Sequence, residues 1–296
     1  MRARPLPWRA TRDPYALLVS EVMLQQTQAS RVIPYYEAFL TRFPDPATLA
    51  AAAPRDVLAA WSGLGYNRRA LALHAAARAV EAGGWPDDLT DLPGVGPYTA
   101  AAVASFAWDR QQVAIDTNVR RVLERFDGVR RSPTALTRRA HEVLPVGRAA
   151  AFNQAMMELG ATVCRPRAPR CDACPIRHAC ATRAADRQAA DRGAADVSGA
   201  AHRAPPGVDH TRNGADDRGR NGVRDAGDQA ARPGVKRTRF EDTDRWARGR
   251  VVAALLAGEP VPPGIVGERR ERVLAGLQRD GLIELGRDGA PELPGG

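Results

Sequence analysis

The hydrophobic and polar positions of the first half of the chain follow a helical period. Between Asp13 and Phe152, apolar residues recur about every 3.6 positions, and short turns rich in Gly and Pro separate the segments. No run in this region alternates apolar and polar residues as a half-buried strand does. The pattern predicts an all-α region with helices at about 14–28, 33–42, 46–52, 55–61, 68–82, 98–107, 117–126, 133–144 and 149–159.

The pattern changes abruptly after Cys180. Residues 181–235 are dominated by Ala, Arg, Asp and Gly, with almost no large apolar side chains, so this stretch is predicted to be a disordered linker. Periodic segments return at about 244–257 and 268–280, and a small hairpin is expected from Leu282–Leu285 and Pro291–Leu293. We therefore predict three parts: a helical domain over 1–180, the linker, and a small winged-helix-like module over 236–296.

Four cysteines, the only ones in the chain, form a compact group with the spacing C-x6-C-x2-C-x5-C. Four thiolates can hold tetrahedral zinc or an iron–sulfur cluster, and zinc sites usually show two short C-x2-4-C pairs where this chain has one. Two disulfides are a third reading, although no signal peptide or membrane span indicates an oxidising compartment. The spacing favours a [4Fe–4S] cluster held in the loop 164–180 by Cys164, Cys171, Cys174 and Cys180.

The charge of the chain points to a polyanionic partner. The formal net charge is +9 with an isoelectric point near 10.2, and most of the excess lies before residue 180. Nearly every strong cation is an arginine, since Lys236 is the only lysine. A reaction that needs a lysine amine as its nucleophile therefore has no candidate before Lys236.

A glycine-containing turn precedes the helix expected at 98–107. In Leu92-Pro-Gly-Val-Gly-Pro97, the segment Gly94, Val95 and Gly96 would bring backbone N–H groups close to a phosphate at the positive end of a helix. This is the pattern of a helix-hairpin-helix element that binds the DNA backbone, and an ordinary helical turn is the alternative.

Two carboxylates stand in contrasting surroundings. Glu21 lies in a helix that is apolar nearly all round, so burial should raise its pKa unless an arginine pairs with it. Asp116 precedes the helix that begins at Thr117, where an N-cap position keeps a carboxylate ionised. Plain structural roles are the alternatives, but together the pair suits an acid and an anionic stabiliser.

Taken together, these segments resemble adenine DNA glycosylases of the MutY type, which belong to the endonuclease III superfamily of helix-hairpin-helix glycosylases. The resemblance runs from about residue 6 to residue 180 and rests on the four cysteines together with Ser20–Gln28, Gly63–Tyr66, Leu92–Thr99, Ile115–Val119 and Phe152–Gly160. It implies a monomeric enzyme of base-excision repair that flips adenine out of double-stranded DNA, where it is mispaired with 8-oxoguanine or guanine, and removes it by hydrolysis. A bacterial, cytoplasmic and nucleoid-associated protein without membrane contact is expected.

The resemblance assigns roles residue by residue. Glu21 would protonate the adenine and later activate water, and Asp116 would stabilise the oxocarbenium-like sugar. The adenine pocket would contain Trp8, Arg9, Gln26, Tyr98, Asn118 and Glu158. Tyr66 would intercalate into the duplex, although it could otherwise be a core aromatic, and Gln26 would be a second wedge beside the lesion strand. Thr27 and Leu64 would lie near the 8-oxoguanine.

Tyr98 separates reaction types within the superfamily. Bifunctional members carry lysine at this position and cleave the strand through a Schiff base, which tyrosine cannot form. The resemblance thus implies a monofunctional glycosylase. Two alternatives remain open: a glycosylase for mismatched thymine or oxidised pyrimidines, and a non-catalytic iron–sulfur DNA-binding protein.

Two departures from the family pattern stand out. The N-terminal helix common in the family is expected to be missing or mis-started here, and residues 240–296 are too few for the domain similar to 8-oxo-dGTP hydrolases that many members carry. Such a C-terminus is similar to that of actinobacterial members. Discrimination between 8-oxoguanine and guanine is consequently the part that the resemblance specifies least.

Overall fold

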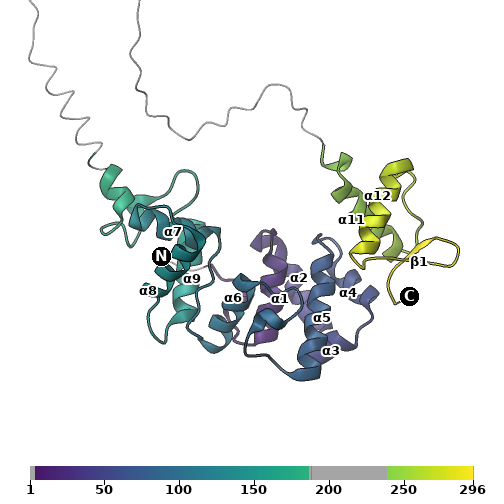
Figure 1. The fold of residues 1–296 in the computed structure, drawn as a ribbon, viewed down its shortest axis with the longest axis horizontal. Coiled ribbons are helices and arrows are strands. Elements are labelled where there is room, and N and C mark those ends of the chain that lie inside the picture. Colours follow the sequence, from purple (N-terminus) through teal and green to yellow (C-terminus); the bar gives the residue numbers. More distant parts are fainter. Residues whose placement is uncertain (1–3, 187, 189–238, 296) are drawn as a thin grey trace, which may run out of the picture.

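The computed structural model describes residues 4–186, 188 and 239–295, and Figure 1 shows their arrangement. The described part is mostly helical, as the sequence predicts, and its longer helices before residue 163 form one consecutive series. These helices are α1 (Pro14–Leu24), α2 (Ala29–Arg42), α3 (Pro46–Ala51), α4 (Pro54–Trp61), α5 (Arg68–Gly83), α6 (Pro97–Trp108), α7 (Thr117–Asp127), α8 (Pro133–Glu142) and α9 (Ala149–Thr162).

Caps and prolines explain why most of these helices begin where the sequence predicts. Asp13, Asp45 and Ser132 each accept a backbone N–H from the first turn of the following helix, α1, α3 and α8 respectively. Each of these three helices also has proline at its first position, where a missing amide donor has no consequence.

Two helix boundaries differ from the prediction by four residues, more than any other boundary does. The first helix was expected to continue to residue 28, but α1 ends at Leu24, and residues 25–28 form a turn in which Gln26 has φ of +56°. Helix α2 starts at Ala29 rather than at residue 33, with Pro34 inside it. Pro34 has no amide to donate to the carbonyl four residues back, yet the helix continues through it.

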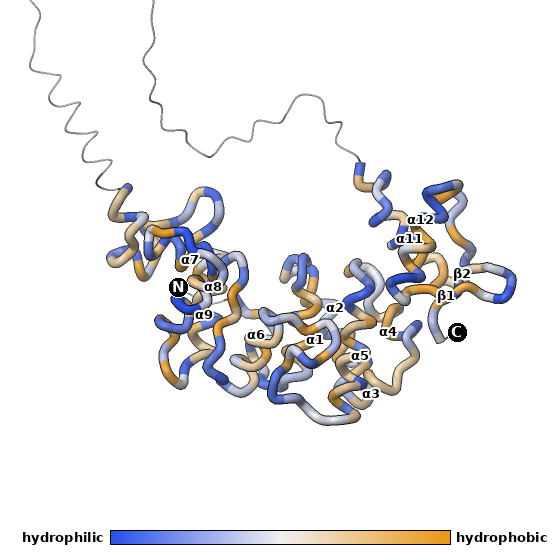
Figure 2. The backbone as a smooth tube through the Cα atoms, in the orientation of Figure 1, coloured by the Kyte–Doolittle hydropathy of each residue, from blue (hydrophilic) through white to orange (hydrophobic). Residues whose placement is uncertain are grey.

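Two hydrophobic clusters form the core. Helices α1 and α6 pack against each other at the centre of the larger cluster, and both are buried on nearly all sides, over Tyr15–Met23 and Thr99–Ala107. A separate smaller cluster joins α7, α8 and α9. Figure 2 shows hydrophobic stretches where the central helices pack, while the turn between the two strands is hydrophilic. The loop that leads from α6 to α7 therefore runs between two packed units.

The C-terminal module consists of α11 (Asp244–Leu256), α12 (Gly267–Arg279) and the antiparallel strands β1 (Glu284–Leu285) and β2 (Pro291–Glu292). These are the two helices and the hairpin that the sequence predicts. The module lies beside α4 and α5 (Figure 1), and its buried Val251 and Val252 belong to the larger core cluster. An ion pair of 3.4 Å between Arg68 Nη1 and Asp280 Oδ1 joins it to α5.

The predicted linker lies largely outside the described residues, as do residues 236–238 of the predicted module. Its first residues, 181–186, are helical, so ordered structure continues beyond Cys180. Among the described helices, none has the length and apolar character needed to cross a membrane.

Candidate active site

Glu21 and Tyr98 meet where α1 packs against the N-terminal end of α6. Glu21 is 5% exposed, and the hydroxyl of Tyr98 donates a hydrogen bond to its carboxyl group. Burial raises the pKa of Glu21 to about 7; the hydrogen bond from Tyr98 opposes this rise and the charge of Asp116 adds to it. A carboxyl group with such a pKa holds a proton at neutral pH in a substantial fraction of molecules.

Asp116 faces this pair from the other core unit. It caps α7, and its Oδ1 accepts the backbone N–H of Val119 at 2.7 Å. Its Oδ2 accepts a hydrogen bond from Asn118 Nδ2, also at 2.7 Å. Asp116 raises the pKa of both Glu21 and Tyr98, which places these three groups within electrostatic reach of one another. Two carboxyl groups from different units thus share one site.

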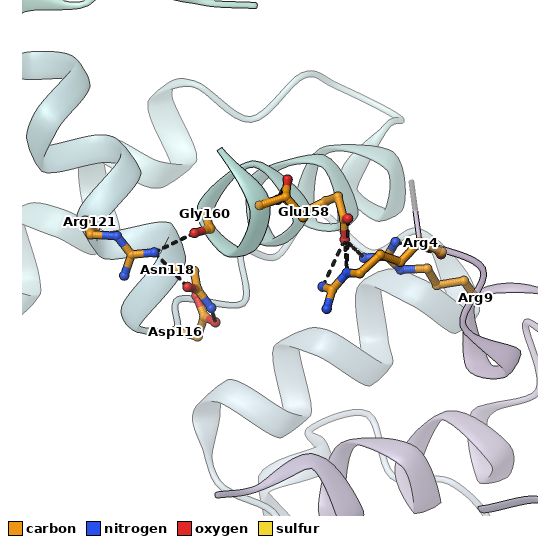
Figure 3. Close-up of polar contacts among 8 residues, drawn as sticks. Arg4, Arg9, Asp116, Asn118, Arg121, Glu158 and Gly160 are labelled. Atoms are coloured by element: carbon orange, nitrogen blue, oxygen red, sulfur yellow. Dashed lines mark hydrogen bonds and ion pairs between the residues drawn. The ribbon is translucent and has the colours of Figure 1, made fainter. Parts of the chain in front are cut away.

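Asn118 is fixed by Arg121, one turn further along α7. Figure 3 shows the guanidinium of Arg121 between the Asn118 side chain and the carbonyl of Gly160 on α9. Its Nη2 donates to Asn118 Oδ1 at 2.8 Å and to Gly160 O at 2.7 Å, and its Nε donates to the carbonyl of Cys164 at 2.8 Å. A side chain at position 160 would not fit, because an added Cβ would lie 2.6 Å from Asn118 Cβ. A series of hydrogen bonds from the Cys164 carbonyl through Arg121 and Asn118 to Asp116 thus connects the cysteine loop to the site.

Glu158 is held by the N-terminal segment. Its carboxylate is 2% exposed and pairs with Arg9 Nη2 at 2.7 Å and with Arg4 Nη2 at 3.0 Å, as Figure 3 shows. Burial would raise the pKa of Glu158, but the hydrogen bonds from Arg9 and Arg4 hold it below its ordinary value. Of the other residues assigned to the adenine pocket, Trp8 packs edge-on against Tyr36 in the core, with ring centroids 5.5 Å apart.

Two turns that were expected to enter DNA lie side by side. Gln26, in the turn after α1, accepts a short hydrogen bond from the hydroxyl of Tyr66, in the turn before α5. Thr27 and Leu64 lie in the same two turns and line a groove beside Gln26 and Tyr66, and Leu64 is largely buried. Gln26 therefore bonds to Tyr66, and among the described residues no hydrogen bond joins it to Glu158 or Asn118. The polar contacts pair Glu21 with Tyr98, Asn118 with Asp116, and Arg9 with Glu158.

The Gly94–Gly96 segment forms a tight turn between α5 and α6. Gly94 has φ of +74°, and an added Cβ there would lie 2.6 Å from the Cβ of Ala72 on α5. Leu92 and Val95 are buried and anchor the turn, whereas Gly94 and Gly96 are exposed at the start of α6. Backbone groups at this helix start are therefore accessible from outside.

The four cysteines lie in the loop after α9. Burial raises the pKa of the Cys171 thiol, Arg183 lowers it, and the other three cysteines raise it, so the four sulfur atoms face one region. Arg125 of α7 donates to Cys164 Sγ at 3.5 Å and to the carbonyl of Arg165 at 2.7 Å, which ties the loop to the smaller core. Among the described residues, no three or more His, Cys, Asp or Glu side chains are arranged to hold a metal ion.

Comparison with known proteins agrees with this geometry. Residues 19–145 match the family described as HhH-GPD superfamily base excision DNA repair protein. The chain is 37% identical to an adenine DNA glycosylase of Mycobacterium tuberculosis, over 99% of this chain and 90% of that protein. The chain belongs to the adenine DNA glycosylase family.

Other proteins match a shorter region of the chain. The chain is 46% identical over 187 residues to an adenine DNA glycosylase of Mycolicibacterium smegmatis, a match that covers 59% of this chain and 64% of that protein. Among solved structures, a thermostable thymine-DNA glycosylase has a TM-score of 0.57 and 32% identity, covering 61% of this chain and 88% of the other. The helical domain is thus the part shared with all of these proteins. The family match ends at residue 145, whereas the alignment with the Mycobacterium tuberculosis relative also extends over the C-terminal module.

Three arginines of the glycosylase site escaped prediction from the sequence. Arg4 pairs with Glu158, Arg121 connects Asp116 to the cysteine loop, and Arg69 joins the two turns that contain Gln26 and Tyr66. In a chain this rich in arginine, composition gives no reason to prefer these three. The signal for Arg121 was its position one turn after Asp116 and Asn118, on the helix face that also presents Asn118.

Proposed function

We propose that this glycosylase removes adenine from DNA where it is mispaired with 8-oxoguanine or guanine. One observation carries the proposal: a buried carboxyl group, Glu21, with a pKa near 7, stands opposite a hydrogen-bonded carboxylate, Asp116, across two helical units. An acid that is protonated near neutral pH and an anion that stays in place are the two groups that cleavage of an N-glycosidic bond requires.

In the proposed reaction, the flipped adenine enters the site between α1 and α7. Glu21 donates its proton to N7 of the base, which makes the base a neutral leaving group as the bond between C1′ and N9 breaks. Asp116 stabilises the positive charge that develops on the sugar, and Asn118 and Val119 hold its carboxylate in place. The ionised Glu21 then accepts a proton from water, which adds to C1′.

Tyr98 makes this enzyme monofunctional in our proposal. It occupies the N-terminal turn of α6 and hydrogen-bonds to Glu21, so the position at which lyases carry an amine holds a phenol. Without a nearby amine, no Schiff base forms with the sugar, and the DNA strand stays intact after excision.

Double-stranded DNA is bound at several places in this proposal. The Gly94–Gly96 turn and the start of α6 receive a phosphate group, while Tyr66 and Gln26 enter the duplex at the mispair, beside the strand opposite adenine. Trp8, Arg9 and Glu158 form the outer part of the adenine pocket. The protein acts as a monomer, in the bacterial cytoplasm at the nucleoid.

The cysteine loop is proposed to hold a [4Fe–4S] cluster through Cys164, Cys171, Cys174 and Cys180. The donor set fits, since four half-buried thiols face one region and arginines of α7 hold the loop that carries them. The cluster would stabilise a loop rich in arginine, including Arg165, Arg167, Arg170 and Arg177, as a surface for phosphates. The hydrolysis itself is carried out by the two carboxyl groups.

The test is single-turnover excision on duplexes that contain A opposite 8-oxoguanine, A opposite G, T opposite G, or thymine glycol. We expect excision only on the two adenine duplexes, visible only after alkaline cleavage, with no adduct trapped by borohydride. Excision of thymine would support the alternative suggested by the 32% identity to a thymine-DNA glycosylase. A trapped adduct would exclude the monofunctional mechanism, and no excision on any duplex would leave a non-catalytic DNA-binding protein.

A further inference from the structure

A large groove lies outside the site of Glu21 and Asp116, between the Tyr66 turn and the C-terminal module. Its volume is about 1150 Å³. One wall comes from the turns around Gln26 and Tyr66, and the other from α11 with the end of α12. The two catalytic carboxyl groups, Glu21 and Asp116, do not line this groove, and neither does Tyr98.

The groove is strongly cationic. Its described lining contains one acidic residue, Asp280, and six arginines: Arg31, Arg68, Arg69, Arg245, Arg248 and Arg250. Asp280 is engaged by Arg68 and Arg248. Within the described part of the chain, no carboxylate pairs with Arg245 or Arg250. These two guanidinium groups of α11 therefore present uncompensated charge to whatever enters the groove.

Aromatic rings alternate with these cations. The guanidinium carbon of Arg245 lies 4.0 Å from the ring centroid of Tyr66 and 5.8 Å from that of Phe240. Phe240 is 60% exposed, although large apolar side chains are usually buried. Arg250 lies 5.9 Å from the ring of Trp246. Guanidinium groups interleaved with accessible rings are typical of surfaces that bind nucleic acid backbones and unstacked bases.

We propose that this groove binds the DNA strand opposite the excised adenine, with Arg245 and Arg250 of α11 in contact with its phosphates. The proposal rests on the proposed function, which places Gln26 and Tyr66 beside that strand. Those two residues form one wall of the groove, so a strand that meets them continues directly along α11. The adenine strand instead has to reach Glu21, which lies outside the groove. The C-terminal module is thereby a second wall of the DNA-binding surface.

The first test measures DNA affinity as a function of salt. The probe is a duplex in which an uncleavable deoxyadenosine analogue stands opposite 8-oxoguanine, and the variant is Arg245→Ala with Arg250→Ala. Because each lost phosphate contact reduces the slope of log K against log salt by about 0.9, two contacts reduce it by about 1.8. The matched control is Arg270→Ala with Arg287→Ala, which removes the same charge from the same module outside the groove. An unchanged slope in the groove variant would overturn the proposal.

The second test assigns the strand. Neutral methylphosphonates replace phosphates near the mispair, on one strand at a time. We expect substitution on the strand opposite adenine to weaken binding by the wild-type protein and to have little further effect on the groove variant. We call this dependence of the substitution effect on the two arginines coupling. Coupling to methylphosphonates on the adenine strand instead would overturn the assignment of the strand. Adenine excision measured on the same proteins separates the two hypotheses: loss of coupling with normal excision refutes the groove alone, and coupling without excision refutes the proposed reaction.

Discussion

The chemistry of Glu21 follows from its burial in a helix that is apolar on nearly all sides. Its side chain is 5% exposed, and this burial raises its pKa to about 7. Tyr98, which lies 77 residues further along the chain, meets Glu21 through the packing of α1 on α6.

The raised pKa predicts how excision depends on pH. If Glu21 must be protonated to donate to adenine, the single-turnover rate constant should be constant below the pKa of about 7 and fall with rising pH above it. The fall should approach tenfold per pH unit. Rates at constant ionic strength on the duplex with A opposite G would measure it. Glu21→Gln should abolish the reaction across the range, and a rate that increases through neutral pH would contradict the assignment of Glu21 as the acid.

The same pKa predicts a cost in stability. The folded protein keeps the Glu21 proton between the ordinary value of 4.5 and about 7, while the unfolded chain loses it, so this group makes stability fall as pH rises through that window. Glu21→Gln removes the effect. The difference in free energy of unfolding between the variant and the wild type should shift in favour of the variant by on the order of 3 kcal/mol from about pH 5 to about pH 8.5. Urea unfolding at both pH values tests this, and an equal difference at the two would contradict it.

At the scale of elements, capping and periodicity predicted most helices, and long-range contacts explain where they failed. The end of α1 at Leu24 carries no glycine or proline signal. It is set by Arg69 of α5, whose Nη1 donates to the carbonyls of Val22 at 2.8 Å and Met23 at 3.1 Å. The carbonyls that a longer helix would have used internally are satisfied by a side chain more than 40 residues away. The turn that presents Gln26 exists for this reason.

Helix α7 offers a prediction about positioning. Arg121 bonds Asn118, Gly160 and Cys164 at once, and glutamine is too short and too poor in donors to replace it. Arg121→Gln should lower the excision rate roughly 10- to 100-fold, because Asp116 is then held less accurately. DNA affinity should change far less. Arg120→Gln, at the neighbouring half-buried position, is the control, and equal excision rates for the two variants would contradict the positioning role of Arg121.

Asn153 of α9 fixes the segment that leads to Asp116. This side chain has no exposed surface, accepts the amide of Ala114 at 3.1 Å, and donates to Gln112 O at 2.8 Å and Ser105 Oγ at 3.0 Å. Asn153→Ala leaves several buried groups unsatisfied, and we expect a loss of roughly 2–4 kcal/mol in the free energy of unfolding. Gln111→Ala, on the exposed side of the same segment, should have little effect in the same denaturation assay.

At the scale of the whole molecule, the sequence predicted the parts better than their assembly. The composition after Cys180 marked off the C-terminal helices and hairpin, since periodic apolar positions return only near residue 244. Their docking beside α4 and α5 was not predicted. It depends on Val251 and Val252, two apolar residues among many, and on the ion pair between Arg68 and Asp280. Surface complementarity of this kind leaves no periodic trace in a sequence.

The two separate cores predict a local response to loss of the cysteine loop. Arg121 and Arg125 of α7 bond the carbonyls of Cys164 and Arg165, and the smaller core joins α7, α8 and α9 without α1–α5. Cys174→Ser should lower the iron content and accelerate amide hydrogen exchange in α7 and at the end of α9, while exchange in α1 and α5 stays unchanged. Ile176→Ala, between Cys174 and Cys180, controls for a change in the loop alone. Acceleration spread evenly through α1–α9 would instead mean that the two cores unfold together, and a variant with full iron content would remove Cys174 from the ligand set.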